Sequence, residues 1–364
     1  MPPRIRTTRK LAFQCLENRL LMAADISLSP AGELKVLGTE AAEVVTFDNV
    51  WNPQSSGTQG KGTYGTAYNA SPILTSAIQA TTIQATVKTS SGQIVLQKTF
   101  DANTVAKLLV IAGGGNDTLT NNTSKPSTMY GGNGDDVLQG GSARDDLFAG
   151  NLDNTDSFAA SNTLRGGGGG DYLTGAGLVD YLYGEAGGDY LSAGNAIVAK
   201  LYGGEDGDTI DGGAGNDTIY GGAGDDIIHG GQGNDVIFGD GGLDEIRGGA
   251  HDDTIHGGAD GDNIDGDSGN DKLYGDGGDD ELRGGTDNDQ LVGGGDADVL
   301  VGNSGSDAMF SDFGGDGMTT QSYLNDDKMY WDYFDTVNGF WAIYIPFSTM
   351  EVTGRYTGYL YVTG

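Results

Sequence analysis

The chain has 364 residues, 66 of them glycine, and its charge is strongly acidic. Glycine has no side chain to bury, so this content argues against an ordinary enzyme core, while only seven prolines and 37% apolar residues argue against collagen and simple disorder. Fifty-two acidic against 19 basic side chains give a formal net charge of -33. Nucleic acids and anionic membranes need basic surfaces to replace their counterions, so the expected partners are cations instead.

Residues 1–24 differ from the rest of the chain and are predicted to be an N-terminal targeting segment. They hold five of the 19 basic residues and one acid, Glu17. The stretch LAFQCLENRLLMAAD resembles the LEPR-x-L-L export motif of bacterial surface proteins, with Asn18 in place of the proline. The alternative is a frayed amphipathic helix. No run approaches the ~20 apolar residues of a spanning helix, so no transmembrane segment is expected.

Residues 25–111 alternate in the manner of short strands and hairpins, and are predicted to form a β-rich N-terminal region. Ile83, Ala85 and Val87 alternate before a turn near Gly92, and a second run extends over residues 94–100. Residues 320–364 are strand-like and aromatic, and are predicted to form a β-rich C-terminal cap. Neither range contains a histidine or a cysteine, so no catalytic constellation is visible in them.

Between these regions the chain repeats every nine residues. Residues 203–319 divide without gaps into 13 units such as GGEDGDTID and GGAGNDTIY, and such a period is the mark of a solenoid. Residues 112–202 contain further units and are predicted to be an interrupted part of the same array. Its interruptions, at 121–130, 149–165 and 193–202, are expected to be irregular inserts.

The unit itself predicts a turn followed by a short strand. Position eight is always Ile, Leu or Met, and in a three-residue strand this side chain faces the core while its neighbours face outward. Glycines in the turn supply positive φ angles, and the residues that replace them at positions two and four are types that tolerate this region. They are Asp206, Asp240, His251, Asp260, Asp267, Asp276, Asp287, Asp296, Asn303 and Asp312.

The sixth position is aspartate in all 13 units, which predicts a metal site. Stacked turns place these carboxylates ~4.8 Å apart, where each like-charge pair costs about 1 kcal/mol in water and more at lower dielectric. Carboxylate and carbonyl oxygens without paired Cys or His suit Ca²⁺, whereas Mg²⁺ demands a stricter geometry. The candidate ligands are Asp171, Asp189, Asp208, Asp217, Asp226, Asp235, Asp244, Asp253, Asp262, Asp271, Asp280, Asp289, Asp298 and Asp307.

The units closely resemble the RTX, or hemolysin-type calcium-binding, repeat G-G-x-G-x-D-x-U-x. The resemblance implies an all-β fold, a right-handed parallel β-roll (a β-solenoid of nonapeptide repeats) in which each unit stacks on the second unit along. It also implies multiple Ca²⁺ ions between stacked turns, held by the position-six aspartates and turn carbonyls. GAGLVDYLY and GGSARDDLF depart from the pattern in their turns, which weakens Asp180 and Asp145 as ligands.

Stacking of every second unit also predicts an aromatic stripe at position nine. We hypothesise that the stripe binds the aromatic tail, a second copy of the chain or a surface glycan, since contiguous exposed apolar area usually marks a contact surface. The alternative is cross-strand stacking that only stiffens the roll. The column contains Tyr202, Tyr220, Phe238, His256, Tyr274, Val292 and Phe310.

Together these features predict an exported, non-enzymatic calcium-binding protein that is loose at low cytosolic calcium and folds in the extracellular space or at the cell surface. Its expected role is structural or adhesive. The alternative is a secreted hydrolase of the carboxylate-only glycosidase type that uses the β-roll as a folding aid.

Overall fold

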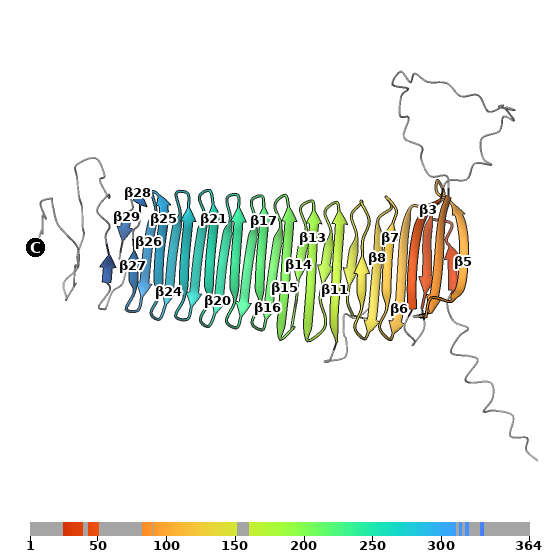
Figure 1. Ribbon diagram of the computed structural model, residues 1–364, viewed down its shortest axis with the longest axis horizontal. Helices are drawn as coiled ribbons and strands as arrows, with labels where there is room; N and C mark the ends of the chain where they lie inside the picture. Colours follow the sequence, from red (N-terminus) through yellow and green to blue (C-terminus); the bar gives the residue numbers. More distant parts are fainter. Residues whose placement is uncertain are drawn as a thin grey trace, which may run out of the picture.

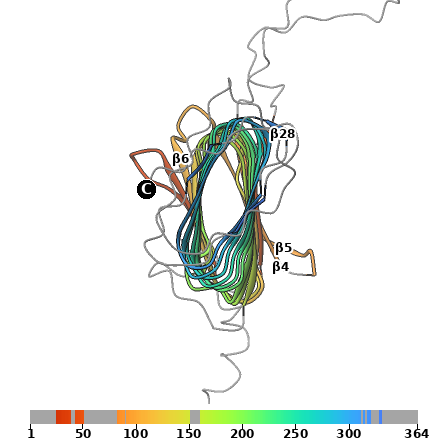
Figure 2. The ribbon, with the colours of Figure 1, turned by 90° about the vertical axis from the view of Figure 1, so that its left-hand side faces the viewer.

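The computed structural model describes residues 25–38, 43–50, 82–89, 91–150, 160–310, 313–314, 317–319 and 328–330. Every regular element in these ranges is a β-strand. The strands stack along one long axis (Figure 1), and the view down this axis shows two sheets that face each other in a flattened ring (Figure 2). The predicted targeting segment 1–24 and most of the predicted cap 320–364 lie outside the described residues.

The first sheet has 14 strands and begins with an antiparallel pair. From one edge to the other its strands are β1 (Asp25–Leu28), β2 (Glu33–Leu37), β6 (Lys107–Gly114), β8 (Ser127–Asn133), β10 (Asp146–Phe148), β12 (Tyr172–Thr174), β14 (Tyr190–Ser192), β16 (Thr209–Ala214), β18 (Ile227–Gln232), β20 (Glu245–Ala250), β22 (Asn263–Ser268), β24 (Glu281–Thr286), β26 (Val299–Ser304) and β29 (Gly317–Thr319).

The second sheet has 16 strands and ends in two antiparallel pairs at its N-terminal edge. In the same direction its strands are β5 (Ile94–Asp101), β4 (Thr82–Thr89), β3 (Glu43–Val50), β7 (Thr118–Asn122), β9 (Val137–Gln139), β11 (Ser161–Gly168), β13 (Val179–Ala186), β15 (Val198–Glu205), β17 (Thr218–Ala223), β19 (Val236–Gly241), β21 (Thr254–Ala259), β23 (Lys272–Gly277), β25 (Gln290–Asp296), β27 (Ala308–Phe310) and β30 (Lys328–Tyr330), with β28 (Phe313–Gly314) paired to β25.

Consecutive repeat units alternate between the two sheets, so two units make one turn. Thr209 of β16 pairs with Ile227 of β18, and Thr218 of β17 pairs with Val236 of β19, in both cases across 18 residues and in parallel. This register confirms that each unit stacks on the second unit along. The chain is therefore a parallel β-solenoid.

The N-terminal strands extend the two sheets instead of forming a separate layer. The predicted hairpin is confirmed, because β4 and β5 pair antiparallel with Ile83 opposite Phe100. β2 pairs in parallel with β6, and β3 with β7. Ile26 and Phe47 are buried in the same core as the repeats. The predicted boundaries at 111 and 202 fall within β6 and β15.

The segments expected to be irregular inserts, 121–130, 149–165 and 193–202, are irregular only in part. Each contributes a strand to the solenoid: β8 begins at Ser127, β11 at Ser161 and β15 at Val198. Met129, Leu164 and Leu201 occupy the core position and are fully buried. The glycine-rich turn is lost from these segments, but the short strand with one inward apolar residue is kept, and this is enough to pair and to bury.

The core is a stack of single apolar residues contributed by successive strands. Position eight of every described regular unit is buried, as predicted, and the side chains before and after it are exposed or half-buried, except Val301. Ile228 is 0% exposed, whereas its neighbour Ile227 is 44% exposed. Burial of one such side chain stabilises a fold by about 1.5–3 kcal/mol, so this column supplies much of the apolar stabilisation.

We predict that Ile228→Ala lowers the stability of the calcium-loaded protein by about 2–5 kcal/mol, because it leaves a cavity in a core to which each strand contributes a single apolar side chain. Ile227→Ala removes the same atoms from an exposed position and should cost about 0.5 kcal/mol or less. Urea unfolding of both variants, followed by circular dichroism, measures the difference. Equal losses would show that position eight is not the core.

Candidate metal centre

Each described turn of the regular array is shaped by residues with positive φ at positions two and four. The predicted exceptions to glycine are confirmed at all nine described positions, with φ between 65° and 85°. Asp206 and Asp240 both have a φ of 73°, for example. Asp312 lies outside the described residues. Glu185 also has a positive φ, 80°, which the sequence did not suggest because glutamate rarely takes this conformation.

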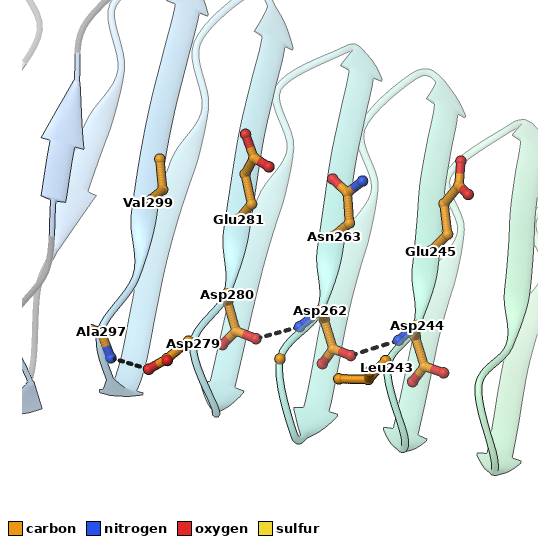
Figure 3. A pocket seen from close by; sticks show the side chains of 11 residues that line it. Leu243, Asp244, Glu245, Asp262, Asn263, Asp279, Asp280, Glu281, Ala297 and Val299 are labelled. Atoms are coloured by element: carbon orange, nitrogen blue, oxygen red, sulfur yellow. Dashed lines mark hydrogen bonds between the residues drawn. The ribbon is translucent and has the colours of Figure 1, made fainter.

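The position-six aspartates lie in two columns, one along each edge of the solenoid, and their side chains are buried. Figure 3 shows Asp244, Asp262 and Asp280 in a row along the first column. The first column contains the candidate ligands Asp171, Asp189, Asp208, Asp226, Asp244, Asp262, Asp280 and Asp298, and the second contains Asp217, Asp235, Asp253, Asp271, Asp289 and Asp307. Asp316, in the last unit, lies outside the described residues.

One carboxylate oxygen of each aspartate joins neighbouring turns. The backbone N–H of Asp226 donates to Oδ1 of Asp244 at 2.8 Å, and the N–H of Asp235 donates to Oδ1 of Asp253 at 2.8 Å. The same bond recurs along both columns, as Figure 3 shows between Asp262 and Asp280. Oδ1 therefore helps to hold each rung of the solenoid to the next, where a rung is one full turn made of two repeat units.

The second oxygen, Oδ2, has a different environment. It is buried and has no hydrogen-bond partner within the described part of the chain, and an ionised oxygen in such a place is costly unless a cation or a proton neutralises it. This arrangement is found at Asp171, Asp189, Asp208, Asp217, Asp226, Asp235, Asp244, Asp253, Asp262, Asp271, Asp280 and Asp289.

Backbone carbonyl oxygens lie close to these unpartnered atoms. A Cβ added to Gly221, at position one, would lie 2.3 Å from Oδ2 of Asp226 and 2.8 Å from the carbonyl oxygen of Gly239 in the next rung. No group of three His, Cys, Asp or Glu side chains converges among the described residues. The donors available are thus carboxylate oxygens from stacked rungs and turn carbonyls, an all-oxygen set that fits Ca²⁺.

Burial raises the pKa of these carboxyl groups far above the ordinary aspartate value. The pKa of Asp253 and of Asp289 rises to about 8, and that of Asp226 to about 7. Burial is the largest cause, neighbouring carboxylates in the column add to it, and the N–H bond from the adjacent rung opposes it. The folded, metal-free column therefore holds its negative charge poorly at neutral pH.

Sequence reasoning missed the residues that take the sixth position in the segments read as inserts. Ser127, Asn162 and Ala199 stand there, and Asn162 and Ala199 interrupt the second column. The triplets Thr-Met-Tyr, Thr-Leu-Arg and Lys-Leu-Tyr that follow them have the outward–inward–outward pattern of the regular strands. That pattern was the available signal.

The predicted aromatic stripe is present as a ladder of stacked rings. Tyr202, Tyr220, Phe238, His256 and Tyr274 have ring centroids 4.5–5.2 Å apart and planes within 14° of parallel. Tyr183 extends the ladder, and Val292 separates it from Phe310 in the same register. A second ladder, which the sequence analysis did not identify, runs through Tyr130, Phe148, Tyr172 and Tyr190 on the other sheet.

The stacking limits what the faces of these rings can contact. A ring inside the ladder has a neighbour against each face, so those faces are closed to a sugar and the geometry gives no support to a stacked glycan. The cross-strand contact that stiffens the solenoid is what the structure shows. A role of Tyr202, Tyr220, Phe238, His256, Tyr274 and Phe310 in binding the tail or a second copy stays a prediction.

The raised pKa values predict how the metal-free chain responds to pH. Unfolded aspartate has a pKa near 3.9, so the folded chain binds more protons than the unfolded chain between about pH 4 and pH 8. Stability without metal is thus highest at low pH and is lost as the pH rises through the folded values of about 6 to 8. In excess EGTA, circular dichroism should show more β-structure at pH 5.5 than at pH 8.

Calcium needs the ionised carboxylates, so the calcium-loaded protein should not show this gain of β-structure on acidification. It serves as the control. A metal-free chain with equal β-signal at both pH values, or with more at pH 8, would contradict the burial of these carboxyl groups.

The family model of the RTX calcium-binding nonapeptide repeat matches residues 127–156, 158–191, 202–237, 229–264, 256–291 and 283–318. No curated protein matches the chain. The matched residues include both aspartate columns, from Asp171 to Asp307. Over residues 127–318 the chain therefore belongs to the family of RTX calcium-binding nonapeptide repeats.

Proposed function

We propose that calcium binding between stacked turns drives the folding of this solenoid, and that the two columns of position-six aspartates are its ligands. One observation carries the proposal: the buried Oδ2 atom that recurs, without a hydrogen-bond partner, beside backbone carbonyls of the next rung. The ion would supply positive charge where the fold concentrates negative charge. Because the unfolded chain has no preformed site, the free energy of binding becomes free energy of folding.

The charge of the regular array supports this coupling. Residues 203–319 contain 29 acidic side chains and three basic ones, Arg247, Lys272 and Arg283. The pairs that Arg247 and Arg283 make are to Glu245 and Glu281 on the outer surface, not to the buried columns. The columns are therefore left without a protein cation in the described residues, and repulsion along them opposes closure of the turns.

We further propose that the protein is exported and acts outside the cell as a structural or adhesive element. Extracellular calcium modules commonly bind with Kd of ~10⁻⁴ to 10⁻³ M, so the array would stay open at cytosolic calcium and close after export. The described residues include no helix that is long and apolar enough to cross a membrane.

A non-catalytic role is favoured because the histidines and buried aspartates make structural contacts. All three histidines lie in the array. His251 occupies a turn position with positive φ, and His256 is stacked in the ladder with its Nδ1 2.9 Å from Asp276 Oδ2. The buried aspartates hold rungs together. Among the described residues these groups therefore have structural roles.

Titration with calcium tests the proposal directly. In EGTA at pH 7.5 we expect little β-signal from residues 203–319, and addition of Ca²⁺ should restore it in a cooperative transition that EGTA reverses. Magnesium at the same concentration should restore much less, because it prefers octahedral sites and loses its water reluctantly. A fully formed and equally heat-resistant β-fold after chelation would sink the proposal.

Calcium binding should depend on the buried carboxylate of Asp253 but not on the exposed carboxylate of its neighbour, Asp252. Asp253→Asn keeps the size of the side chain but removes a buried charge that faces two inter-rung positions, so we expect about two fewer bound Ca²⁺ ions per chain by calorimetry. Asp252→Asn is the matched control, since Asp252 lies on the surface and accepts hydrogen bonds from Asn270. Equal calcium binding by both variants would count against the aspartate columns as ligands.

A further inference from the structure

In two turns of the solenoid, both oxygens of the position-six carboxylate accept hydrogen bonds from the protein. In the first, Oδ1 of Asp145 accepts hydrogen bonds from the backbone N–H of Ser127 at 2.5 Å and from its hydroxyl at 2.6 Å. Oδ2 accepts the backbone N–H of Gly141, at position two of the same turn, at 2.6 Å. The side-chain amide of Asn121 adds a weaker contact to Oδ1 at 3.4 Å.

The second such turn contains Asp180, on the other edge of the solenoid. Its Oδ2 accepts the backbone N–H of Gly177 at 3.0 Å, and its Oδ1 accepts the side-chain amide of Asn162 at 3.0 Å. Asn162 occupies the sixth position of the rung before, where regular turns have an aspartate. An amide group of the protein thus donates to the carboxylate across the space between rungs.

The next rung on this edge has no carboxylate at all. Ala199 stands at the sixth position, although its N–H still donates to Oδ1 of Asp217 at 2.6 Å, as in the regular turns. Along the second column, the stretch from Asn162 through Asp180 to Ala199 therefore contains no stacked pair of carboxylates. A Ca²⁺ ion there would lack the two charged ligands available elsewhere, and the donors already present would have to be displaced.

Charge and packing change at the same place in the chain. Residues 25–202 contain 17 acidic and nine basic side chains, far closer to balance than the 29 and three of residues 203–319. The N-terminal strands also bring larger side chains to the core, including Phe47, and pair through backbone bonds that involve no carboxylate. Less repulsion opposes folding here, and more apolar area favours it.

We propose that the described residues up to 202 form a calcium-independent base, closed at Asp145 and Asp180 by hydrogen-bond donors that stand in place of a cation. The inference rests on the proposed function, since it divides the solenoid into a part that needs calcium and a part that does not. Asp171 and Asp189, on the other edge, keep the unpartnered Oδ2 of regular turns. Asp117 also stacks on Asp136 along the edge that contains Asp180, so the base offers stacked carboxylates to calcium on both edges but does not depend on calcium to fold.

Such a base would direct how the regular array folds. Its last strands, β14 and β15, carry the edges on which β16 and β17 pair in register. A repeat array folds by adding units to a neighbour that is already in place. The folded base provides this first neighbour, so the regular array does not have to form an isolated rung. Calcium then closes rungs onto a template.

Hydrogen–deuterium exchange of the full chain, read by mass spectrometry in EGTA and in calcium, tests this division. In EGTA we expect amides of residues 107–150 and 160–202 to exchange roughly tenfold or more slowly than those of residues 209–310. Calcium should slow exchange in 209–310 to the level of the base. Uniformly fast exchange in EGTA would overturn the base but keep calcium-driven folding; uniformly slow exchange would overturn the proposed function itself.

Two variants test whether the hydrogen-bond donors at Asp180, and not the overall stability of the chain, hold the base together. Asn162→Ala should speed exchange of residues 160–202 in EGTA by roughly tenfold, whereas Asn234→Ala, at an exposed turn position, should leave it unchanged. Asp180→Asn should leave the number of bound Ca²⁺ ions at the wild-type value, in contrast to Asp253→Asn. An unchanged base in Asn162→Ala, or a lower calcium count in Asp180→Asn, would overturn the assignment of Asp180 as a metal-free closure.

Discussion

The structure depends on one recurring conflict: at twelve of the described turns a buried carboxylate has only one of its two oxygens in a hydrogen bond. Oδ1 is indispensable to the fold, because it accepts the N–H that joins one rung to the next. The same bond fixes Oδ2 in a place without a donor. A side chain without an acceptor oxygen would lose the rung-to-rung bond, and a free carboxylate leaves a buried charge. A divalent cation between turns resolves both demands at once.

The remaining features follow from this conflict. Each strand contributes only one apolar side chain to the core, so a rung buries little apolar area. The free energy gained from this burial cannot outweigh the repulsion between carboxylates along both edges without added positive charge. Where the chain supplies its own donors, at Asp145 and Asp180, the turn sequence departs from the glycine pattern because it no longer has to shape an ion site. Under the proposed division of the solenoid, sequence regularity and metal dependence rise together along the chain.

Much of the fold was predictable because it is determined within nine residues. Position eight, the positive φ of Asp206 or His251 and the 18-residue register all follow from local chemistry and period. Strands β8, β11 and β15 were missed because a three-residue pattern is too short to detect once its turn loses glycine. The bonds of Asn121 and Asn162 could not be predicted either, since they join residues 18 or more positions apart.

The aromatic ladder has a consequence for solubility. A row of tyrosines and a phenylalanine on an outer face would ordinarily promote aggregation, as large exposed apolar patches do. Here each ring inside the row covers the faces of its neighbours, and the stacking continues from Tyr183 past the end of the base to Tyr274. Water meets a narrow strip of ring edges in place of broad apolar planes. The face can be rich in aromatic residues and still remain wettable.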